Sequence, residues 1–106
     1  MKAELLEEEF RPRGAAPESS LLLLRAADAV ELVDRAAEEG VPILGIDGFR
    51  LSAQGLEPAL DHIADYSAAV ADGHGCWEAA DAFIRARSDA SLVFELTLGD
   101  DPVEAV

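Results

Sequence analysis

The stretch from Leu92 to Leu98 constrains the fold of this chain more than any other. Its leucine and phenylalanine residues alternate with Val93, Glu95 and Thr97. This two-residue period is typical of a strand that buries one face. Such a strand needs further strands to pair with and a layer of helices to cover its apolar face. The rest of the chain is therefore expected to supply both.

Two other apolar stretches predict strands. One runs from Leu21 to Leu24 between polar residues, and the other runs from Val41 to Ile46. The dipeptide Asp47-Gly48 follows the second stretch and is favoured in tight hairpin turns. Since Phe49 resumes the apolar pattern, this segment predicts either a hairpin or a bulged strand.

Three segments have helical spacing. The first begins at Asp28, which can cap a helix with Glu31 three residues later, and it ends at Gly40 before Pro42. The second covers Leu56 to Val70, with Pro58 in its first turn.

The third helix starts at Trp77 and has one apolar face. Asp81 and Arg85 are four residues apart on the same helix and are expected to pair. At the other end of the chain, a helix that begins at Ala3 has to stop before Pro12.

Together these elements predict an α/β (α+β) fold. We expect a two-layer sandwich, with a small mixed sheet of about three to four strands and about three helices on one face. With 106 residues the chain forms a single domain, 1–106. We divide it into an adaptable N-terminal leader (1–19), a compact core (20–98) and an acidic C-terminal tail (99–106). The expected core residues are Val33, Ile46, Trp77, Phe83, Ile84 and Phe94.

The charge of the chain excludes several classes of partner. Asp and Glu total 22 against 8 Lys and Arg, for a net charge of −14. Such a field repels nucleic acid and anionic membranes, so neither is an expected partner. No glycine-rich phosphate loop is present and Lys2 is the only lysine, so no nucleotide or other cofactor is expected. Cys76 is the only cysteine and the N-terminus lacks a secretory pattern, which favours the cytoplasm.

The acidic residues include one regular series. Glu57, Asp61 and Asp65 recur every four positions and form one ridge if residues 56–70 are helical. A charged series of this kind often serves only to solvate a helix. The functional interpretation is a negative surface that steers and pairs with Lys or Arg of a basic protein, while Tyr66 provides an amphipathic anchor.

Two other groups of residues suggest an enzyme or a ligand-binding protein instead. His62 lies between Asp61 and Asp65, so a carboxylate could orient it as a general base. His74 and Cys76 are two residues apart, and Cys76 precedes a helix, where the pKa of a thiol can be lowered. We expect no metal site, because a zinc centre needs more ligands in fixed geometry than this loop offers.

Four segments carry a resemblance to a known group of proteins: residues 43–51, 61–67, 77–84 and 94–96. Their order resembles that of small, uncharacterised bacterial proteins, some of them similar to immunity proteins of bacterial toxin systems. The resemblance implies an intracellular antidote that binds and blocks a cognate toxin, often a nuclease with a basic surface.

The sequence thus predicts a non-enzymatic protein-binding module, with immunity against a basic toxin as its most concrete form. The predicted partner-binding residues are Glu57, Asp61, Asp65 and Tyr66. The first alternative is a small enzyme or ligand-binding protein that uses His62 or the His74 and Cys76 pair. The second is a self-associating module, a homo-oligomer built through an exposed strand edge or through the strand near the C-terminus.

Overall fold

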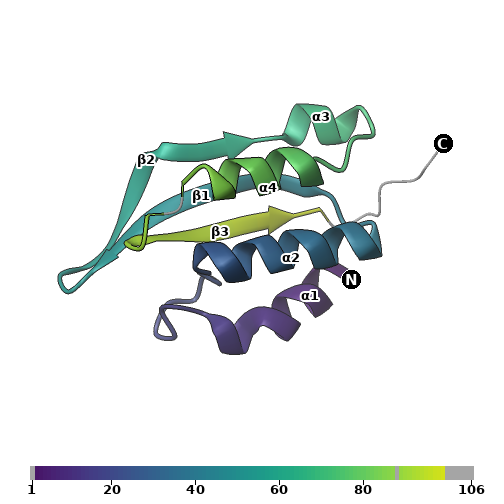
Figure 1. Ribbon diagram of the computed structural model, residues 1–106. Helices are drawn as coiled ribbons and strands as arrows, with labels where there is room; N and C mark the ends of the chain where they lie inside the picture. Colours follow the sequence, from purple (N-terminus) through teal and green to yellow (C-terminus); the bar gives the residue numbers. More distant parts are fainter. Residues whose placement is uncertain (1, 88, 100–106) are drawn as a thin grey trace.

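The computed structural model describes residues 2–87 and 89–99. Figure 1 shows the helices and strands along the chain. The helices are α1 (Lys2–Phe10), the short 3₁₀ turn η1 (Arg11–Arg13), α2 (Ala26–Glu39), α3 (Ser67–Ala71) and α4 (Trp77–Arg85). The strands are β1 (Ile43–Ser52), β2 (Gly55–Asp65) and β3 (Leu92–Leu98).

The three strands form one sheet in the order β2-β1-β3, and α2 and α4 cover one of its faces (Figure 1). This arrangement confirms the expected α/β sandwich. Both strand pairs are antiparallel over the described residues. The sheet there is therefore purely antiparallel, whereas we expected a mixed one. For β1 and β2 the reason is the two-residue hairpin turn that joins them, which only antiparallel neighbours allow.

The predicted strand over residues 21–24 is reduced to a single bridge. Leu24 exchanges two backbone hydrogen bonds with Phe94, of 2.9 and 2.7 Å, at the outer edge of β3. The predicted strand from Val41 is present, begins at Ile43 and continues to Ser52. Of the two interpretations of Asp47-Gly48, the bulged strand is confirmed, since the register shifts between Asp47 and Phe49.

The predicted helix over residues 56–70 is wrong. Residues Gly55 to Asp65 form β2, and only the five residues of α3 are helical. Gly55, at φ 122°, follows the tight turn and lets the chain reverse onto β1. The hydrogen-bonded sheet then overrides the four-residue spacing of the apolar residues.

The ends of α2 and α4 agree in part with the sequence. Gly40 ends α2 in the left-handed conformation, at φ 71°, as predicted. Helix α2 starts at Ala26, however, and Asp28 does not cap it; Asp28 accepts a 3.3 Å hydrogen bond from Arg13 instead. Helix α4 begins at Trp77, and the predicted pair between Asp81 and Arg85 is present.

Helix α1 packs on α2 and contributes to the core. It ends before Pro12, as predicted, and buries Ala3, Leu6 and Phe10. The packed structure therefore starts well before residue 20, where we expected the core to begin. In the acidic tail, residues 100–106 lie outside the described residues.

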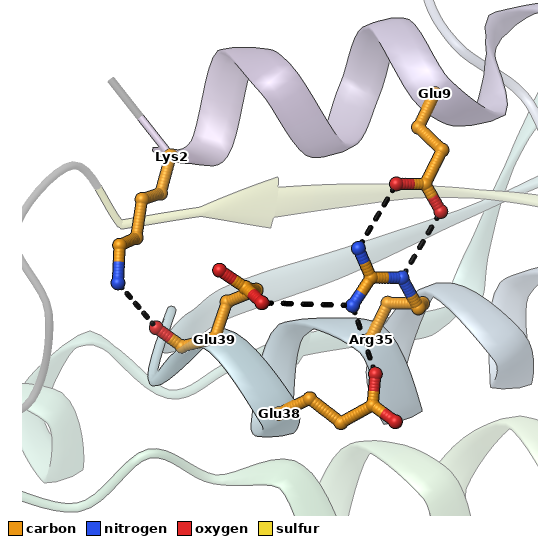
Figure 2. A network of polar contacts seen from close by, with 5 residues as sticks. All are labelled: Lys2, Glu9, Arg35, Glu38 and Glu39. Atoms are coloured by element: carbon orange, nitrogen blue, oxygen red, sulfur yellow. Dashed lines mark hydrogen bonds and ion pairs between the residues drawn. The ribbon is translucent and has the colours of Figure 1, made fainter.

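A network of polar contacts fastens α1 to α2 (Figure 2). The Arg35 guanidinium donates two 3.0 Å hydrogen bonds to the two carboxylate oxygens of Glu9 and a third, of 2.8 Å, to Glu38. The Lys2 ammonium donates to the backbone carbonyl of Glu39 at 3.3 Å. Bidentate pairing of this kind fixes the relative orientation of the two side chains and strengthens the contact between them.

The apolar residues form two clusters, one on each face of the sheet. The main core between sheet and helices includes Val33, Ile46, Ile84 and Phe94, all at most 1% exposed, and the half-buried Trp77 and Phe83 pack against it. The second cluster lies on the opposite face near the β1-β2 turn. It consists of Ala15, Ala16, Leu23, Phe49, Leu51, Leu56 and Val93.

Candidate protein-binding surface

Strand β2 is the open edge of the sheet. Only β1 pairs with it, whereas Leu24 bridges the outer side of β3. Two large apolar side chains are exposed on β2: Leu60 is 77% exposed and Ile63 is 47% exposed. Asp61 and Asp65 flank Ile63 and are also exposed. We call these four residues, Leu60, Asp61, Ile63 and Asp65, the acidic edge.

A bulge in β2 sorts the three predicted acidic residues onto two faces. Phe49 pairs with Pro58 and Asp47 pairs with Ile63, so that Gly48 alone faces residues 59–62. Because the step from 58 to 63 is five positions, an odd number, it reverses which face the alternate side chains occupy.

The predicted ridge is therefore divided. Glu57 lies opposite Arg50 on the helix side of the sheet. Asp65 lies on the other face, in the row of Gly45 and Thr97, and Asp61 precedes Ile63 in the alternation on that face. The structure thus places Asp61 and Asp65 on one face of the sheet and Glu57 on the other.

The face of the sheet beside the acidic edge is uncovered and carries more carboxylates. A shallow hollow of about 310 Å³ lies over Gly45, lined also by Asp47, Ile63 and Asp65. Asp47 stands directly opposite Glu95 of β3. Burial raises the pKa of Glu95, and the negative charges of Asp47 and Glu7 raise it further. Like charges directly across a strand pair repel, so this face is destabilised by its own charge.

The basic residues of the protein are engaged elsewhere. Five arginines pair with carboxylates outside β2: Arg11 with Glu8, Arg13 with Asp28 and Glu31, Arg35 with the Figure 2 glutamates, Arg50 with Asp89, and Arg85 with Asp81. The other three, Lys2, Arg25 and Arg87, donate to backbone carbonyls, and Arg87 also donates to His62. These eight are all the Lys and Arg residues of the chain. Within the described structure, no ion pair reaches the carboxylates of β2.

The two residues at the end of β2 differ in their freedom to bind a partner. Asp65 accepts hydrogen bonds from the backbone N–H of Ser67 at 2.9 Å and from its hydroxyl at 2.7 Å, and these bonds lower the pKa of Asp65. Its carboxylate stays charged and oriented. Tyr66 is half-buried and packs against the core, where burial raises its pKa. The exposed apolar residues of this region are thus Leu60 and Ile63, which the sequence did not single out as anchors.

The two reactive side chains of the enzymatic alternative, His62 and Cys76, each contact other residues. The Nδ1 of His62 accepts a 3.1 Å hydrogen bond from the Arg87 guanidinium, which itself stacks on the Phe83 ring. Cys76 adopts a left-handed conformation at φ 63°, and its Sγ lies 3.8 Å from the backbone carbonyl oxygen of His74. Burial raises the pKa of the Cys76 thiol, which favours the neutral form over a nucleophilic thiolate.

The described part of the chain lacks two features that would indicate other kinds of binding. Among residues 2–87 and 89–99, no three His, Cys, Asp or Glu side chains lie close enough together to hold a metal ion. No described helix is long and apolar enough to span a membrane.

Comparisons with known proteins give no family for this chain: no family model matches it, and no curated protein matches its sequence.

Proposed function

We propose that this protein is a non-enzymatic protein-binding module whose acidic edge takes a basic protein partner. One observation carries the proposal: the acidic edge exposes Leu60 and Ile63 among carboxylates that no arginine or lysine of the described chain neutralises. Exposed apolar side chains provide the buried contact area of an interface, and unpaired charges around them select and steer a partner of opposite sign.

The most concrete form of this function is that of an immunity protein that neutralises a basic bacterial toxin in the cytoplasm. This form rests on the resemblance of the four sequence segments and on the net charge of −14. An antidote must capture its toxin quickly, and complementary charge speeds association to as much as about 10⁸ to 10⁹ M⁻¹s⁻¹ at low salt.

The test begins with affinity capture from lysate of the native host at low and high salt, followed by rate measurements on the purified pair. We expect D61N/D65N to slow association about three- to tenfold at low salt and much less at high salt. The control E4Q/E78Q changes the net charge equally at exposed positions of α1 and α4 and should leave the rate nearly unchanged. Equal rates for the wild type and D61N/D65N would reject the proposal.

A second measurement separates the immunity form from general protein binding. The captured partner is expressed alone and then together with this protein, and growth of the host is followed. Growth arrest that this protein relieves, and that D61N/D65N relieves less well, supports the immunity form. A partner without toxicity removes that form and leaves the binding function in place.

A further inference from the structure

The free edge of β2 has backbone groups that no strand of the described protein uses. The Tyr66 N–H donates to the Leu44 carbonyl at 2.8 Å, so the backbone of Tyr66 points toward β1. Since backbone direction alternates along a strand, Ala64 also points toward β1, whereas Ile63 and Asp65 point outward. Their N–H and C=O groups form a template for one more strand.

The side chains of the same stretch suit a strand of particular chemistry. From Asp61 to Asp65, exposed residues alternate with half-buried ones, so Asp61, Ile63 and Asp65 share one face. A strand added here places its own side chains directly beside these three on the uncovered face. An apolar residue fits opposite Ile63, and Lys or Arg fits opposite each aspartate.

A second copy of this chain does not satisfy that pattern. In a two-fold antiparallel pairing of β2 with β2 centred on Ile63, Asp61 of each copy faces Asp65 of the other. Like charges directly opposite destabilise a strand pair. The sequence of β2 contains no Lys or Arg that could compensate.

Pro58 and the bulge limit where the added strand can extend. Pro58 has no N–H to offer and the register is broken between residues 58 and 63. The usable edge therefore runs from Asp61 to Asp65, which accommodates a short segment rather than a long strand.

From these observations we infer that the acidic edge binds its partner by strand addition. An extended segment of the partner with the pattern basic-x-apolar-x-basic pairs antiparallel with residues 61–65. This inference rests on the proposed function, because it specifies how the basic partner is held. Main-chain hydrogen bonds provide affinity, and the two basic side chains provide selectivity.

The probe is a synthetic peptide, acetyl-Thr-Lys-Thr-Ile-Thr-Lys-Thr-amide, titrated into the protein at low ionic strength and followed by NMR. We expect hydrogen exchange of the Ile63 and Asp65 amides to slow at least about tenfold on binding. The Ala64 amide, which already points toward β1, is the internal control and should not change. D61N/D65N should weaken binding several-fold, and the exposed control pair E4Q/E78Q should not.

Two peptide variants separate the inference from the proposed function. A peptide methylated on the central isoleucine nitrogen keeps all side chains and charges but loses the hydrogen bond to β2. We expect it to bind about tenfold more weakly, and equal binding would overturn strand addition while leaving the charge-based function intact. A peptide with Glu in place of both Lys residues should not bind; if it binds equally well, the proposed function itself fails.

Two further outcomes of the peptide experiment would overturn the inference. Absence of any peptide binding at low ionic strength overturns strand addition. Protection of the Ile63 and Asp65 amides in the protein alone, increasing with its concentration, identifies a second copy as the occupant and overturns the inference as well.

Discussion

The carboxylates of the α1-α2 pair and those of β2 have opposite surroundings. On the helices, Glu9, Glu38 and Glu39 surround Arg35 (Figure 2). Arg13 likewise pairs with both Asp28 and Glu31. On β2, Asp61 has no ion pair within the described part of the chain. The acidic residues thus fall into two groups. Those on the helices link one element to another through ion pairs, whereas Asp61 on β2 has no ion pair within the described residues.

The acidic residues that pair with Arg35 and Arg13 have a structural role. A carboxylate that accepts charge-assisted hydrogen bonds contributes to stability, whereas unpaired carboxylates close together reduce it. Negative charge that is kept at a cost in stability is typical of a binding surface, because functional sites break local rules of design.

The largest effect is expected in the helical region, at Phe10. Its side chain is 1% exposed and belongs to the main core. Phe10→Ala should lower the free energy of unfolding by about 3 to 4 kcal/mol, measured by urea denaturation. A loss below about 1 kcal/mol would show that α1 is the adaptable leader expected from sequence and that its ion pairs do not fasten a structural element.

A smaller effect is expected at Gly48, whose position sets the bulge of β2. A Cβ atom added there would lie 2.7 Å from the Cβ of His62 and 2.8 Å from its carbonyl oxygen. Gly48→Ala should therefore cost about 2 kcal/mol of unfolding free energy, since the backbone of β2 must shift. Unchanged stability in the same denaturation experiment would mean that the bulge does not depend on this close approach.

Glu95 tests whether the uncovered face is destabilised by its own charge. The raised pKa of Glu95 means that the folded protein binds a proton more readily than the unfolded chain does, so stability falls as pH rises from about 4.5 through that raised value. Glu95→Gln should add about 0.5 kcal/mol at neutral pH, a figure kept small because the carboxyl is partly solvated. The gain should disappear below about pH 4, where Glu95 of the wild type is protonated and therefore as neutral as the Gln that replaces it. Thermal unfolding at several pH values measures this, and a gain that persists in acid would exclude charge as its cause.

The parts of the fold set by local patterns could be predicted from sequence. The alternation in β3 and the Gly40 and Pro42 stop after α2 each depend on neighbours in the chain. Strand β2 could not be predicted in this way, because its identity depends on pairing with β1 across the hairpin. One local signal was available: Asp61, Ile63 and Asp65 alternate with His62 and Ala64, the period of a strand.

The candidate surface was predictable in composition but not in arrangement. The acidic series was visible in the sequence, and Asp61 and Asp65 do share a face. Glu57 was assigned to the same ridge because no sequence pattern reveals that the bulge reverses the faces between residues 58 and 63. The half-burial of Tyr66, through its packing against the core, likewise depends on tertiary contacts.

The smallest predicted effects are those of Glu9→Gln and Asp61→Asn on the melting temperature. They test the difference between the helical and the β2 carboxylates most directly, because they are expected to differ in sign. The bidentate hydrogen bonds from Arg35 lower the pKa of Glu9, so its stabilising effect is present above about pH 4.5 and is lost as pH falls through the lowered value. At neutral pH, Glu9→Gln should therefore lower the melting temperature. Asp61→Asn also removes one negative charge, but this charge is repelled by its surroundings and not attracted by an arginine. The melting temperature should therefore stay the same or rise. Higher salt should shrink both differences, since both sites are exposed. If Asp61→Asn destabilised the protein as much as Glu9→Gln does, Asp61 would have a structural partner, and the division of the acidic residues into fastening and available groups would have to be abandoned.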